Sequence, residues 1–205
     1  MEKGIHRETL PNGLSFDMVY VEGGSFMMGG SDEEAFDREK PIHEIRVPSF
    51  YIGKYPVTQG LWEAVKGENP SRFQGSMNPV ESVSWEDAQQ FIQHLNQETD
   101  KPYRLPSEAE WEFAARGGIH SEGYVYAGSD KLKEVGWYDE NAENTTHPVG
   151  QKMANELGIY DLSGNVEEWC ADDWHASYIG APTDASAWVD SPNRGGRRVV
   201  RGGRW

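Results

Sequence analysis

Cysteine is almost absent from the chain, which has a single thiol, Cys170, among 205 residues. One cysteine excludes an internal disulfide and every zinc site that needs two or more thiolates. The neighbouring Glu168, Asp172 and Asp173 are anionic and should raise the pKa of the thiol, whereas an activated thiolate needs a lowered pKa. We therefore expect Cys170 to be a small packing residue rather than a nucleophile.

Long hydrophobic runs are also missing. No stretch approaches the roughly 20 apolar residues of a membrane helix, so we expect no membrane span. Residues 1–13 contain no apolar segment of the kind that marks a secretory signal peptide. The compartment stays open between the bacterial cytoplasm and an exported location reached after removal of a leader.

Paired histidines and phosphate-binding loops are absent as well. The six histidines form no HxH, HxxxH or HExxH pair, so the sequence gives no support for a transition-metal site. His175 lies near Asp172 and Asp173, and a surface loop explains that cluster without a metal. No Walker loop, GxGxxG unit or GxSxG elbow is present.

Basic residues are scarce, because 19 Lys and Arg face 34 Asp and Glu and give a net charge of −15. This balance disfavours nucleic acid as a partner. Residues 191–205 are the exception, since they hold five arginines and no acid. Those arginines either pair internally with acidic loops, which we favour, or form an anion site.

The residue types that are abundant favour a single loop-rich domain that spans residues 1–205. Hydrophobic residues make up only 37% of the chain and the mean hydropathy is −0.75, but 8 Trp, 9 Tyr and 7 Phe predict an aromatic core. The 23 Gly and 11 Pro predict many tight turns.

Local patterns predict short elements. Residues 16–30 fit two strand-like runs around Gly23 and Gly24, residues 42–58 fit one strand ended by Pro56, and residues 197–202 fit a last strand. Helices should begin after Thr58 and after two further caps, which are Ser84 with Asp87 and Ser107 with Glu110. Gly117 should end the third helix. Residues 119–190 show no sustained periodicity.

The stretch YDLSGNVEEW, residues 160–169, carries the strongest local signal for chemistry. Asp161 and Glu168 are carboxylates separated by a Gly-Asn turn that directs backbone carbonyls inward. Two interpretations are open: an oxygen cage for calcium, or a turn with a solvated Asp161 and a helix-capping Glu168.

Six stretches taken in order resemble one family. They are FMMG at 26–29, PVT at 56–58, PVESVSWEDA at 79–88, YRLPSEAEWEFAARGG at 103–118, GIYDLSGNVEEW at 158–169 and RVVRGG at 198–203. Together they resemble the formylglycine-generating enzymes, or sulfatase-modifying factor domains. The resemblance implies an α+β chain with a C-type lectin-like fold, few short helices, small antiparallel sheets and structural calcium.

The resemblance also implies metal ligands. The family's calcium site corresponds here to the side chain of Asp161, the carbonyls of Gly164 and Val166, and the carboxylate of Glu168. A second family site would use Asn141 and the carbonyl of Ala142, although the loop that follows is short in this chain.

The end of the sequence bears on catalysis. In the family's enzymes the paired glycine is followed by a serine and then by two copper-binding cysteines that oxidise a sulfatase cysteine. Here Arg204 and Trp205 follow instead, and Cys170 has no partner thiol, so we expect that the C-terminal part is missing and the copper chemistry is lacking.

Two functions from different classes follow. The first is a non-catalytic binder of a protein or small-molecule ligand, similar to the variable proteins diversified by retroelements, with Arg204 and Trp205 on the ligand-facing C-terminal end. The second is a copper-dependent oxidase whose cysteine segment lies outside this sequence. A structural or accessory domain is a third, less specific hypothesis.

Overall fold

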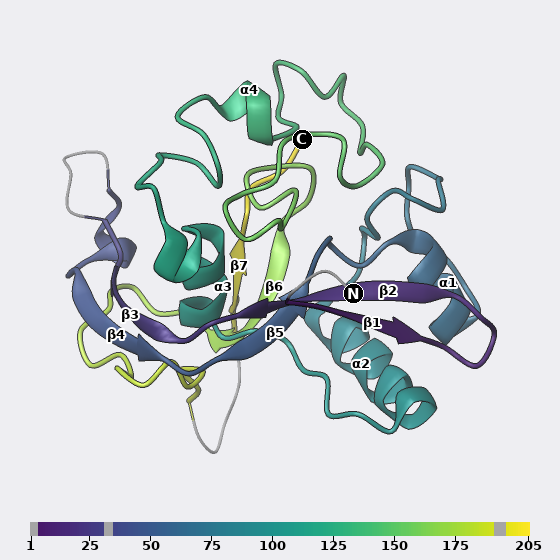
Figure 1. Ribbon diagram of the computed structural model, residues 1–205, viewed down its shortest axis with the longest axis horizontal. Helices are drawn as coiled ribbons and strands as arrows, with labels where there is room; N and C mark the ends of the chain where they lie inside the picture. Colours follow the sequence, from purple (N-terminus) through teal and green to yellow (C-terminus); the bar gives the residue numbers. More distant parts are fainter. Residues whose placement is uncertain (1–3, 31–34, 191–195) are drawn as a thin grey trace.

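The computed structural model describes residues 4–30, 35–190 and 196–205. The fold consists of short elements joined by long loops (Figure 1). The strands are β1 (Ile5–Thr9), β2 (Ser15–Val21), β3 (Gly24–Met28), β4 (His43–Val47), β5 (Phe50–Gly53), β6 (Glu168–Asp173) and β7 (Arg198–Arg201). The helices are α1 (Gln59–Lys66), α2 (Trp85–Thr99), α3 (Glu108–Ala115) and α4 (Leu132–Val135), with 3-10 turns η1 (Asp37–Glu39) and η2 (Gly118–His120).

The strands form three small antiparallel sheets, β1-β2-β5, β3-β4 and β6-β7. Helix α3 lies between the β3-β4 pair and the β6-β7 pair and contacts all four strands (Figure 1). Helices α1 and α2 pack together at the other side of the molecule, beside β1 and β2. Few short helices and small antiparallel sheets confirm the expected α+β class and are consistent with a C-type lectin-like fold.

The helix starts follow the capping signals in the sequence. The Thr58 hydroxyl accepts a hydrogen bond from Leu61 N, and Ser84 and Ser107 each form a capping box with the acid three residues on. Gly117 follows the end of α3 with φ of +88°, the left-handed geometry expected of a helix stop.

The single strand expected over residues 42–58 is wrong. The chain forms β4 and β5 in two different sheets, and the break falls at Pro48 and Ser49. Pro48 has no N–H to donate to a ladder, which favours a crossing at that point. Gly23 makes the crossing possible, because a Cβ there would lie 2.6 Å from the Val47 oxygen.

The core is less aromatic than the composition suggests. Around α3 it is built mostly from Val, Ile, Leu, Met and Ala, with three buried aromatic rings, Trp111, Phe113 and Tyr178. A second cluster under α1 and α2 includes the stacked rings of Trp62 and Phe91. The expectation of an aromatic core is wrong because several aromatic side chains, such as Phe36, Tyr51 and Trp174, are exposed.

The expected loop-rich region and the expected last strand are both confirmed. Between η2 and the last strand the described residues contain only α4 and β6, so this region is mainly loop. The strand at 197–202 forms as β7. In the part of the chain that the structure describes, no helix is long and apolar enough to cross a membrane.

Candidate functional site

A strained turn precedes β6 and positions the carboxylates that the sequence singled out. Asp161 and Asn165 both have left-handed backbone, with φ of +61° and +69°. The Asn165 side chain is fully buried and donates to the carbonyl of His147 at 3.0 Å. A side chain at Gly164 would clash with the Trp137 carbonyl, so this turn requires glycine. The turn is therefore held from outside by neighbouring loops.

Asp161 lies inside this turn with only 2% of its surface exposed. One carboxylate oxygen accepts from Gly150 N at 2.8 Å, and the other accepts from the Asn165 amide at 3.3 Å. Burial raises the pKa of Asp161 above its usual range. The interpretation of Asp161 as a solvated turn residue is therefore wrong.

Glu168 begins β6 and is not a helix cap. Its Oε2 accepts from Trp111 Nε1 at 3.3 Å, whereas its Oε1 is buried and has no hydrogen-bond partner among the described residues. Burial, with the nearby negative charge of Asp161, raises the pKa of Glu168 to about 7. A buried carboxylate oxygen without a partner is costly, and a bound cation would remove that cost.

The ligand set that the family resemblance implies for Glu168 consists of oxygen atoms. Within residues 4–30, 35–190 and 196–205 no group of three or more His, Cys, Asp and Glu side chains is placed to hold a metal. A cation here would use the two carboxylates of Asp161 and Glu168 and, as the family resemblance implies, the carbonyls of Gly164 and Val166. The Gly164 carbonyl already accepts from Val166 N at 3.0 Å. An all-oxygen set of this kind fits calcium better than zinc or copper.

Asn141 is engaged in its own loop. Its Oδ1 accepts from Tyr138 N at 2.8 Å and its amide donates to the Gly136 carbonyl at 3.0 Å. The Ala142 carbonyl pairs with Nε2 of His147 at 3.0 Å. The groups expected at a second calcium site thus already have protein partners, and Asn141 as a metal ligand stays a prediction.

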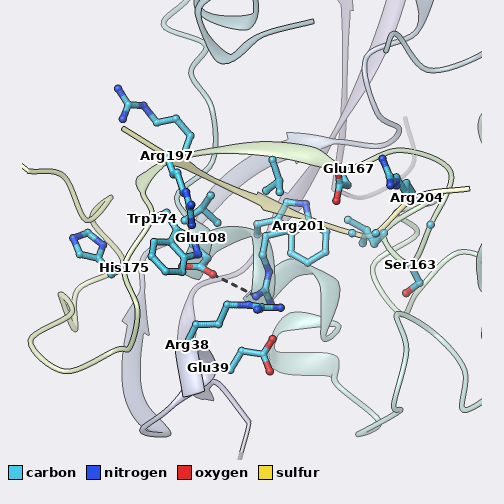
Figure 2. A pocket seen from close by; sticks show the side chains of 18 of the residues that line it. Arg38, Glu39, Glu108, Ser163, Glu167, Trp174, His175, Arg197, Arg201 and Arg204 are labelled. Atoms are coloured by element: carbon cyan, nitrogen blue, oxygen red, sulfur yellow. Dashed lines mark hydrogen bonds and ion pairs between the residues drawn. The ribbon is translucent and has the colours of Figure 1, made fainter. Parts of the chain in front are cut away.

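A groove of about 730 Å³ runs along β7 (Figure 2). Trp174 and His175 lie at one end of the view, and Glu167 and Arg204 lie at the other. Arg201 lies between the two ends. The groove is large enough for a peptide or small-molecule ligand.

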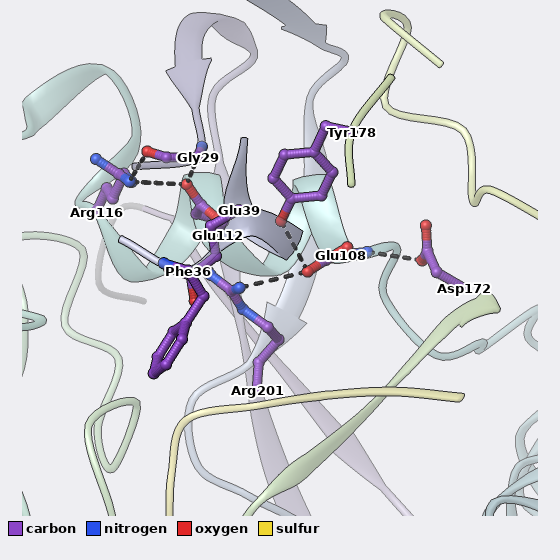
Figure 3. Close-up of polar contacts among 9 residues, drawn as sticks. All are labelled: Gly29, Phe36, Glu39, Glu108, Glu112, Arg116, Asp172, Tyr178 and Arg201. Atoms are coloured by element: carbon purple, nitrogen blue, oxygen red, sulfur yellow. Dashed lines mark hydrogen bonds and ion pairs between the residues drawn. The ribbon is translucent and has the colours of Figure 1, made fainter. Parts of the chain in front are cut away.

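A partly buried ion network borders this groove through Glu108, Tyr178 and Arg201 (Figure 3). Arg201 binds Glu112 at 2.7 Å and Glu108 at 3.3 Å, and the Tyr178 hydroxyl donates to Glu108 at 3.0 Å. Arg116 binds the other oxygen of Glu112. Burial raises the pKa of Glu108. The network fixes β7 to α3 and so fixes the groove edge.

The expected internal pairing of the arginine-rich tail is confirmed in part. Arg201 pairs with Glu108 and Glu112, and Arg198 pairs with Asp173. Arg194 lies outside the described residues.

The two residues expected to bind ligand have different surroundings. Arg204 lines the groove. The Trp205 ring packs edge-on against Phe73, with ring centres 5.0 Å apart, and its backbone N–H donates to the Asn165 carbonyl at 3.4 Å. Trp205 therefore anchors the end of the described chain next to the strained turn.

Comparison with known proteins decides the family. The model of the sulfatase-modifying factor enzyme 1-like domain matches residues 7–205. The chain belongs to this family. It is 36% identical to the chaperone protein LppX of Paenibacillus barcinonensis, in a match covering 94% of this chain and 79% of that protein.

Two solved structures resemble this sulfatase-modifying factor domain over almost its whole length. Treponema denticola variable protein 1 matches with a TM-score of 0.80 and 28% identity, over 98% of this chain and 87% of that one. PvdO from Pseudomonas aeruginosa matches with a TM-score of 0.81 and 31% identity, over 100% of this chain and 88% of that one. The resemblance inferred from the six motifs is confirmed.

The thiol of this sulfatase-modifying factor domain does not fit a copper site of two thiolates. Cys170 is the only cysteine in the sequence and is fully buried in the core on β6. Burial raises its pKa well above the usual range, with a further contribution from Glu108. The expectation that Cys170 is a packing residue is confirmed.

The sequence alone did not identify several other residues that line the groove. The rings of His175 and Trp188 stack with centres 3.6 Å apart, and Arg38 enters the groove from η1. His175 was noted only for its acidic neighbours, and Arg38 lies in an unremarkable charged loop. No local pattern links these positions to β7, because only the folded chain brings them together.

Proposed function

We propose that this sulfatase-modifying factor domain is a non-catalytic ligand-binding module on a calcium-stabilised scaffold, the invariant part of a variable binding protein. The observation that carries the binding role is the groove along β7, lined by arginine and aromatic side chains such as Arg204 and Trp174. Such side chains are common anchors in binding sites. The sealed position of Cys170 supports a role without thiol chemistry.

The similarity to Treponema denticola variable protein 1 also supports the proposed binding role, because that protein shares this scaffold over 98% of the chain. On this proposal Arg204 belongs to the ligand-facing end, and Trp205 supports it from behind through Phe73. The ligand class is a protein or a small molecule.

The observation that supports the calcium is the unpartnered Oε1 of Glu168 beside Asp161. Both carboxylates would bind the ion, together with the Gly164 and Val166 carbonyls. The ion would neutralise the buried charge and hold the strained turn. This turn contacts the residues after β7, because the Asn165 carbonyl accepts from Trp205 N. The role of the ion is structural.

Elemental analysis and thermal unfolding test the calcium. At calcium about 100-fold above the dissociation constant, binding adds about 2.7 kcal/mol, so chelation should lower Tm by about 5–10 °C. Asp161→Asn should abolish this response, whereas Asp139→Asn, on an exposed loop position, should retain it. An unchanged melt with EDTA and no bound calcium would remove calcium from the proposal.

The non-catalytic role has its own assay. Incubation of the purified chain with a sulfatase-type cysteine peptide, copper and oxygen should leave the thiol unchanged by mass spectrometry. Conversion of that thiol into an aldehyde would contradict the proposal and favour the copper-dependent oxidase.

A further inference from the structure

A second calcium ion, by the family resemblance, would lie at Asn141 and the carbonyl of Ala142, in the loop that follows α4. That carbonyl has no lone pair left for an ion. Ala142 is fully buried, and its oxygen accepts from Thr145 N at 3.1 Å and from Nε2 of His147 at 3.0 Å. A carbonyl oxygen has two lone pairs, so both are taken. Because a carbonyl only accepts, the His147 ring carries a proton on Nε2.

The side chain of Asn141 is directed into its own loop. Its Oδ1 accepts from Tyr138 N at 2.8 Å, and its amide donates to the Gly136 carbonyl at 3.0 Å. The acids of this loop are all exposed, and they are Asp139, Glu140 and Glu143. A cation beside Asn141 would therefore have no buried carboxylate to balance its charge, in contrast to a cation beside Glu168.

The polar group that lacks a partner in this loop is a donor. Nε1 of Trp137 is buried and has no hydrogen-bond partner among the described residues. An N–H group cannot bind a cation, whereas the unpartnered atom of Glu168 is an acceptor. The Lys152 ammonium also lies 3.9 Å from the centre of the Trp137 ring, so a positive charge already lies against the loop and would repel an ion.

His147 ties this loop to the turn of the proposed calcium site. Its ring stacks on that of Trp137, with centres 3.8 Å apart and planes 15° apart. Its backbone N–H donates to Oδ1 of Asn165 at 3.1 Å, and its carbonyl accepts from the Asn165 amide at 3.0 Å. One residue thus holds Trp137 and Ala142 on one side and the strained turn on the other, which is the task of a structural ion.

We propose that this chain binds a single calcium ion, at Asp161 and Glu168, and that the His147 imidazole replaces the second ion as the link that holds residues 136–142. This inference rests on the calcium of the proposed function and limits it to one site. Hydrogen bonds and ring stacking then hold the loop at any calcium concentration. Only the turn at residues 161–168 depends on the ion.

Counting the bound ions tests the number of sites. The purified chain is stripped with EDTA, equilibrated with calcium, freed of unbound ions and analysed for metal per chain. We expect one calcium ion per chain, and none in Asp161→Ala or in Glu168→Gln. Two ions per chain, or one ion retained by both variants, would overturn the single site.

Variants of His147 test the link. His147→Leu removes both the donor to Ala142 and the ring on Trp137, and should lower Tm by about 3–8 °C, to the same extent in calcium and in EDTA. His147→Gln keeps an N–H donor and should recover part of this loss. His94→Leu, at an exposed position on α2, is the matched control and should leave Tm unchanged.

The outcomes distinguish this inference from the proposed function. Equal Tm values for His147→Leu and His94→Leu would overturn the link, and so would a loss for His147→Leu that occurs only in calcium, because the imidazole would then act through the ion. One bound ion with a calcium-independent loss supports the inference. No bound ion in the unmodified chain would refute the calcium of the proposed function, and a loss for His147→Leu in the same samples would still support the link.

Discussion

The pKa of Glu168 makes a prediction that separates a metal-free protein from a calcium-bound one. In the metal-free fold, burial beside Asp161 raises the pKa of this carboxyl from 4.5 to about 7. The folded state then holds the proton more tightly than the unfolded state does. The resulting stabilisation is complete below pH 4.5 and is lost as the pH rises to about 7.

The size of this loss follows from the shift. One pKa unit corresponds to about 1.4 kcal/mol, so Glu168 should cost the metal-free fold about 3 kcal/mol between acid and neutral pH. Glu168→Gln keeps the shape of the protonated side chain and cannot ionise. In EDTA the variant should match the unmodified chain at pH 4.5 and should be about 3 kcal/mol more stable at pH 8.

Urea unfolding measures both the pH dependence of the unfolding free energy and the change caused by Glu168→Gln. Glu98→Gln, an exposed change on α2, should follow the unmodified chain at every pH. With saturating calcium at pH 8 the order should reverse, because the unmodified chain gains binding energy that Glu168→Gln cannot. A stability difference in EDTA that does not change with pH would refute the raised pKa. Equal stabilisation of both proteins by calcium would refute Glu168 as a ligand.

Three further outcomes are expected. Arg201→Gln removes the cation shared by Glu108 and Glu112, while Arg116 stays on Glu112, and should cost about 1.5–3 kcal/mol in urea unfolding; a loss below about 1 kcal/mol would contradict the network. Gly164→Ala should destabilise the fold by at least about 2 kcal/mol more than Gly13→Ala, which has open space around the new methyl; similar losses would contradict the tight turn. Cys170 should react with a thiol reagent only at the rate of unfolding, and fast labelling of the native chain would contradict its burial.

Local chemistry made part of the fold predictable. The caps at Thr58, Ser84 and Ser107 depend on residues three positions away, so the sequence alone contains the information. The crossing at Pro48 was missed because the alternation of residues 42–58 continues through it. Only the partner strands decide where one sheet ends and the next begins.

The sequence predicted which residues form the candidate calcium site. It did not predict their burial or their hydrogen-bond partners. The pattern identified Asp161 and Glu168, yet it left both a solvated turn and a cation cage open and favoured the solvated turn. Burial and the unpartnered oxygen decide against the solvated turn, and both arise from distant segments such as Trp111 and Gly150. The sequence could not predict the groove for the same reason, because Arg38 and β7 are far apart in the chain.

The proposed calcium site contacts the residues at the C-terminal end of the described chain, so we expect the two to be thermodynamically linked. Trp111 donates to Glu168 and lies under the Arg201 guanidinium, 5.4 Å away, while Asn165 accepts from the backbone of Trp205. Calcium that orders the turn should therefore also order Arg201 and Trp205, and loss of the Trp205 contact should weaken calcium binding. Calcium titration should give a several-fold lower affinity for Trp205→Ala than for the unmodified chain, and an unchanged affinity for Glu98→Gln. Equal calcium affinity of Trp205→Ala and the unmodified chain would mean that the turn and Trp205 act independently, despite these shared contacts.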